Sequence, residues 1–139
     1  MAAFTIISET NTTQSSLKSL FDFLSDFKNF ASILPEDKVE NFKFSDSECS
    51  FNIKGITPMT IKKIESKPHE FILFSSEGLA KFNFSLKAFF IGEASQNGAC
   101  KIELMGDLNP FIKSMAEKSL INLTNTMSLK LSQLNLGQV

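Results

Sequence analysis

The stretch FNFSLKAFF, residues 82–90, carries an apolar side chain at every second position. This period of two is typical of a β-strand that buries one face and exposes the other. The same period recurs across residues 38–107, where short turns divide it into six segments. Short connections favour antiparallel neighbours, since parallel strands need long crossovers. The sequence therefore predicts a six-stranded antiparallel meander with one apolar face.

Two local signals refine this meander. Lys62 and Lys63 are two successive polar residues, which breaks the alternation and indicates a β-bulge. Gln96-Asn97-Gly98 predicts a tight hairpin turn, because Asn-Gly tolerates positive φ.

The flanking segments have different periods. Residues 3–10 are rich in β-branched and aromatic side chains and predict a first strand. Apolar residues spaced by three and four then predict two short helices, over about 14–26 and 28–34, with Asn11, Thr12 and Thr13 as candidate N-caps. After the meander, Pro110 favours the start of a helix whose apolar stripe continues to Leu134.

The order is thus one strand, two short helices, six strands and one long helix. We expect a single α+β domain over residues 1–139. The apolar face of the meander must be covered, and the C-terminal helix is the element long enough to cover it. A curved sheet around a long helix often leaves a concave apolar space, which is a natural place for a ligand.

This order resembles the START-like helix-grip superfamily, also called SRPBCC, over nearly the whole chain. The resemblance also rests on LSDFKNF at residues 24–30, which runs on to Leu34-Pro35, and on GDLNP at residues 106–110. The superfamily includes pollen-allergen-like ligand carriers, lipid-transfer domains and polyketide cyclases. It implies a seven-stranded sheet, with the first strand beside the last, wrapped around the C-terminal helix over a lipophilic cavity.

Alternate hairpins of a meander lie at the same end of the sheet. The turns near residues 55–58 and 77–80 should therefore share an end with the junction at 107–109, and we expect the mouth of a cavity there. The candidate ligand-binding residues are the inward strand positions nearest this end and the facing residues of the long helix. They are Phe51, Ile53, Met59, Phe84, Leu86, Phe111, Ile112, Met115 and Ser119.

No catalytic residue is predicted. The single histidine, His69, lies in a turn, and Asp107 and Asn109 fit a helix-capping role. The expected function is non-catalytic binding of a small hydrophobic or lipid-like molecule. Two alternatives stay open: a cyclase- or dehydrase-like enzyme acting on a polyketide-type substrate, and a protein-interaction domain whose 15 phenylalanines fill the core.

The composition disfavours several other roles. All basic residues are lysine and the net charge is −1, so nucleic-acid binding is not expected. Two cysteines and one histidine, without metal-ligand spacing, predict no metal and no cofactor, and both thiols are expected to be buried. The N-terminus lacks the features of a signal peptide and no apolar run is long enough to span a bilayer, which predicts a cytoplasmic protein. Phe89 and Ile91 on the outer sheet face are candidates for a homodimer contact.

Overall fold

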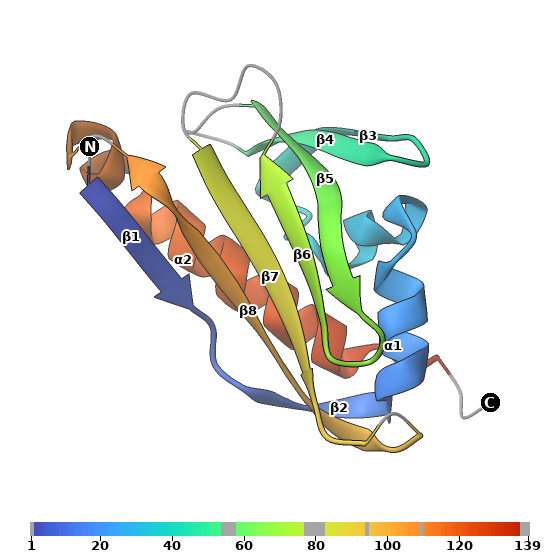
Figure 1. Ribbon diagram of the computed structural model, residues 1–139. Helices are drawn as coiled ribbons and strands as arrows, with labels where there is room; N and C mark the ends of the chain where they lie inside the picture. The colour runs from blue at the N-terminus through green and yellow to red at the C-terminus, as the bar shows by residue number, and fades with distance from the viewer. Residues whose placement is uncertain (1, 54–57, 77–82, 94, 109, 137–139) are drawn as a thin grey trace.

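The computed structural model describes residues 2–53, 58–76, 83–93, 95–108 and 110–136. Its strands form one antiparallel sheet in the order β1-β8-β7-β6-β5-β4-β3, and β2 also pairs with β8 (Figure 1). The strands are β1 (Ala2–Ile7), β2 (Asn11–Ser16), β3 (Val39–Phe44), β4 (Glu48–Ile53), β5 (Pro58–Lys67), β6 (Phe71–Ser76), β7 (Asn83–Ile91) and β8 (Asn97–Leu108). The helices are α1 (Leu17–Leu24), the 3₁₀ helix η1 (Phe27–Ile33) and α2 (Pro110–Gln133).

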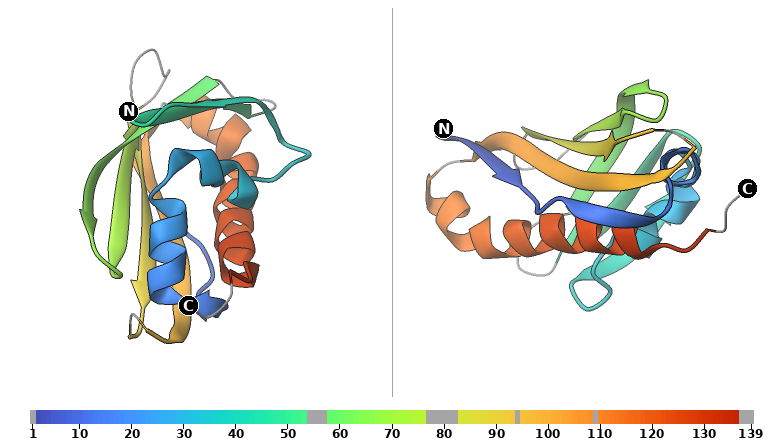
Figure 2. Two further views of the ribbon diagram at one scale, coloured as in Figure 1. Left: turned by 90° about the vertical axis from the view of Figure 1, so that its right-hand side faces the viewer. Right: turned by 90° about the horizontal axis from the view of Figure 1, so that it is seen from below.

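The long helix α2 lies across one face of the curved sheet (Figure 2). It packs on β8, β2, β1 and η1, while α1 and η1 lie between the sheet and α2. Its buried stripe is Ala116, Leu120, Leu123, Met127 and Leu131. The six-strand meander, the long C-terminal helix and the position of β1 beside β8 are therefore as the sequence predicted.

Residues 11–16 differ from the prediction, which placed the start of the first helix there. They form β2, with Asn11 opposite Cys100 and Thr12 opposite Ala99. The reason is the length of β8, whose 12 residues extend beyond the six-residue β1 and leave backbone groups that need partners. The helix begins only at Leu17, where the Ser16 side chain accepts a hydrogen bond from Ser19 N.

The bulge and the last hairpin show one agreement and one difference. The register of β5 against β6 shifts between Lys63 and Glu65, directly after the Lys62-Lys63 pair at which the sequence predicted a bulge. Asn97 and Gly98, in contrast, belong to β8 rather than to the turn, and among the described residues of this hairpin a positive φ, of +130°, occurs at Gly92. Long-range pairing explains this, because Gly98 N donates to Thr13 Oγ1 at 2.9 Å.

An aromatic cluster fills the interior beneath β4–β6. Phe30 of η1 is fully buried, and its ring centroid lies 5.4 Å from that of Phe74 and 6.4 Å from that of Phe51. Phe27 lies 5.8 Å from Phe74 and 6.3 Å from Phe30. The short helices therefore supply the rings that pack this half of the sheet.

Candidate functional site

Four of the predicted ligand-binding residues lie on the inner face of the sheet. Phe51 of β4 is opposite Met59 of β5, and Phe84 and Leu86 lie on β7. All four side chains are buried, with at most 4% of their surface exposed. The sequence therefore placed these residues on the correct face of the sheet.

The surroundings of Phe51 are protein rather than open space. Its ring stacks against Phe30 and lies 6.5 Å from the ring of Phe42 on β3. Phe51 is thus part of the aromatic cluster, and its contact with a ligand stays a prediction.

The predicted helix residues have different positions. Phe111 is 74% exposed, so its side chain lies on the surface, and its contact with a ligand stays a prediction. The side chains of Ile53, Ile112 and Met115 lie outside the described residues. So does most of the predicted mouth, because residues 54–57, 77–82 and 109 are not described.

Ser119, the remaining predicted residue, borders a pocket of about 190 Å³ between α2 and the segment that joins η1 to β3. Figure 2 shows η1 against α2 on this side of the molecule. The lining residues come from both elements and are Pro35, Lys38, Lys118, Ser119, Asn122 and Leu123.

The pocket has an apolar floor and a polar rim. Pro35 and Leu123 are buried, Ser119 is half-buried, and Lys38, Lys118 and Asn122 are exposed. Helix geometry explains one wall, because residues at positions i, i+3 and i+4 share a helix face, as Ser119, Asn122 and Leu123 do.

The opposite wall is held in place from α2. Lys130 Nζ donates a hydrogen bond of 2.8 Å to the carbonyl oxygen of Leu34. This bond fixes the end of η1 next to Pro35. Helical spacing could have added Asn122 and Leu123 to the predicted site, but no pattern in the sequence relates Pro35 or Lys38 to this helix.

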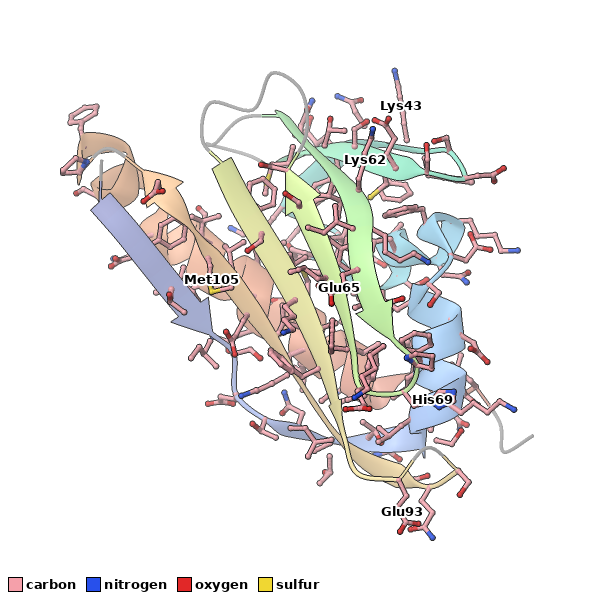
Figure 3. All side chains as sticks on the ribbon, in the orientation of Figure 1. Lys43, Lys62, Glu65, His69, Glu93 and Met105 are labelled. Carbon is pink, nitrogen blue, oxygen red and sulfur yellow. The ribbon has the colours of Figure 1, made fainter. Side chains whose placement is uncertain are left out.

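The histidine and the two cysteines, which could serve as a general base or as nucleophiles, lie away from this pocket. His69 is half-buried beside α1, with its ring 5.6 Å from that of Phe21 (Figure 3). Burial raises the pKa of Cys49 to about 12, with the neighbouring Glu48 charge adding to the shift. Burial raises the pKa of Cys100 to about 11, against an opposing hydrogen bond with Ser128. Both thiols are therefore protonated at neutral pH.

The described residues provide neither a metal-binding cluster nor a membrane-spanning helix. No group of three or more His, Cys, Asp or Glu side chains in this part of the chain could hold a metal ion. No helix within the same residues is long and apolar enough to cross a membrane.

The outer face of the sheet carries the residues predicted for a dimer contact. Ile91 is 46% exposed, and Phe89 is half-buried beneath Lys87 Nζ and Lys101 Nζ, which lie 4.8 and 5.0 Å from its ring centroid. A homodimer through this face stays a prediction. The same face has an open hollow that is bordered by Ser75, Ser85 and Met105.

No protein-family model matches the sequence, and no curated protein matches it either. Solved structures do match the fold. Norcoclaurine synthase from Thalictrum flavum has a TM-score of 0.68 at 11% identity, covering 94% of this chain and 85% of that one. A point mutant of that enzyme, in complex with a transition-state analogue, has a TM-score of 0.66 at 8% identity and covers 94% of this chain and 96% of that one.

A START superfamily protein from Mycobacterium smegmatis has a TM-score of 0.63 at 11% identity, covering 91% of this chain and 96% of the other. At such identities the likeness shows the fold alone. With the sheet order and the position of α2, it shows that this chain has the START-like helix-grip fold, as the sequence predicted.

Proposed function

We propose that this protein binds a small hydrophobic molecule, without catalysis, in the pocket between α2 and the segment that joins η1 to β3. The observation that carries the proposal is the pocket at Ser119, whose floor residues Pro35 and Leu123 are buried while its rim is open to solvent. A concave site with an apolar floor and a few polar groups is the usual form of a small-molecule site.

The fold also supports the binding of a small molecule. The norcoclaurine synthase mutant holds a transition-state analogue, so one protein of this architecture accommodates a small organic molecule. The proposal for this chain extends to such binding and includes no reaction. Among the described residues that line the pocket there is neither an imidazole nor a carboxylate to act as a general base.

One observation favours a second candidate, a protein-interaction domain with a filled core. The rings of Phe27, Phe30, Phe51 and Phe74 contact one another and occupy the interior beneath β4–β6. A ligand in the described interior is therefore expected on the α2 side of this cluster.

Native mass spectrometry tests the proposal with two matched variants. In Ser119→Trp the indole fills the pocket, whereas in Ile121→Trp the same side chain projects from an exposed position of the same helix. Each protein is measured as purified and after incubation with decan-1-ol as an apolar probe. Circular dichroism checks that both variants are folded.

We expect the unmodified protein and Ile121→Trp to carry a small-molecule adduct or to take up decanol, and Ser119→Trp to do neither. Uptake by none of the three proteins would contradict ligand binding and favour the interaction domain. Equal uptake by all three would place the ligand away from this pocket.

A further inference from the structure

We propose that the ligand is an anionic amphiphile, an alkyl chain that ends in a carboxylate, and that Lys38 and Lys118 hold the carboxylate. This inference rests on the proposed function and specifies the chemical class of its ligand.

The two lysines reach the pocket from different elements. Lys38 lies in the segment between η1 and β3, and Lys118 lies on α2. Ser119 and Asn122, also on α2, add a hydroxyl and an amide that can donate hydrogen bonds. The rim therefore offers donors and positive charge on both sides, which suits a group that accepts several hydrogen bonds.

Neither lysine has an anionic partner among the described residues. Other charged side chains do have partners: Lys28 pairs with Asp26, Lys67 with Glu70 and Lys101 with Glu103, and Glu40 and Lys62 are not free either. Unlike these, Lys38 and Lys118 are available for an external anion.

The acidic neighbours do not cancel this charge inside the pocket. Glu36, Asp37 and Glu117 are exposed and close in sequence, but none of them lines the pocket. The described lining thus carries two positive charges and no negative one, in a chain whose net charge is −1. The positive charge is local to this site.

The floor decides between a free anion and an amphiphile. An inorganic anion would satisfy the lysines but would make no use of the apolar floor that Pro35 and Leu123 form. An alkyl chain behind the carboxylate packs on this floor and removes its own apolar area from water.

Isothermal titration calorimetry with decanoate and decan-1-ol separates the two contributions. The two probes have the same chain length and differ in the charge of one end. An exposed ion pair contributes up to about 1 kcal/mol, or roughly fivefold in affinity, so two lysines should favour decanoate by up to about 25-fold. Acetate serves as the carboxylate without a chain.

The test variant is Lys38→Gln/Lys118→Gln. The control variant is Lys18→Gln/Lys63→Gln, which changes the net charge equally at exposed positions on α1 and β5. We expect the test variant to lose the preference for decanoate and to keep its affinity for decanol within about twofold, whereas the control variant keeps both.

Each other outcome has a separate meaning. Equal affinity of the unmodified protein for the two probes would overturn the carboxylate inference and leave the proposed function intact. Binding of neither probe would overturn both. Acetate bound as tightly as decanoate would contradict the amphiphile, and loss of the preference in the control variant would contradict the assignment to Lys38 and Lys118.

Discussion

Replacement of Phe30 by alanine tests whether the aromatic cluster is as tightly packed as the structure shows. Phe30 has no exposed surface, and the rings of Phe27, Phe51 and Phe74 surround it. These neighbours belong to the 3₁₀ helix and to two strands that are paired on both sides, so they have little freedom to close over a cavity.

The expected loss follows from this environment. Truncation of a buried phenylalanine to alanine costs about 3–5 kcal/mol, and more when the site cannot relax. We therefore expect the free energy of unfolding to fall by about 4 kcal/mol, a large part of the total of about 5–15 kcal/mol for a domain. For a chain of 139 residues this corresponds to a decrease in Tm of roughly 14 °C.

Urea denaturation followed by far-UV circular dichroism measures this change, with Phe111→Ala as the control. Phe111 is 74% exposed, so its removal should change the free energy of unfolding by less than about 0.5 kcal/mol. A loss below about 1.5 kcal/mol in Phe30→Ala would refute the reasoning, because Phe30 would then border space that is already empty.

Two further predictions concern buried polar groups. Ser15 Oγ donates a hydrogen bond of 2.6 Å to Leu134 O and accepts one of 2.9 Å from Leu136 N. Ser15→Ala should therefore lower the free energy of unfolding by about 1–3 kcal/mol and speed amide hydrogen exchange at Leu136. Unchanged exchange at Leu136 would contradict the role of Ser15. The raised pKa values of Cys49 and Cys100, about 12 and about 11, keep both thiols neutral, so iodoacetamide at pH 8 should modify them in urea and not in the folded protein. The thiols of the unfolded chain ionise near pH 9. The contribution of the buried neutral thiols to the free energy of unfolding should therefore be complete below pH 9 and decrease as the pH rises toward 11–12. A free energy of unfolding that is constant across this range would contradict the burial of the thiols.

Much of the fold could be predicted because its signals are local. The alternation through Phe84 and Leu86 identified the inner face of β7, and the spacing from Ala116 to Leu131 identified the buried stripe of α2. Each pattern needs only a few neighbouring residues, and the side-chain period of a strand or helix is set by backbone geometry.

The residues of the candidate site were harder to predict from local sequence patterns. Ser119 was found because it interrupts the apolar stripe of the helix, but an apolar residue such as Phe51 looks the same in a sequence whether it borders a ligand or another ring. The inner face could be predicted, whereas the division of that face between packed core and pocket could not.

The sequence by itself determined the order of the elements, the faces they bury and the local charge of each segment. Only the tertiary structure decided that residues 11–16 pair with β8, that Phe30 fills the space beneath β4–β6, and that Lys38 and Lys118 border one pocket. The physical reason is that these contacts join segments far apart in the chain, and their partners are selected by the backbone groups and surfaces that remain unsatisfied after the local elements have formed.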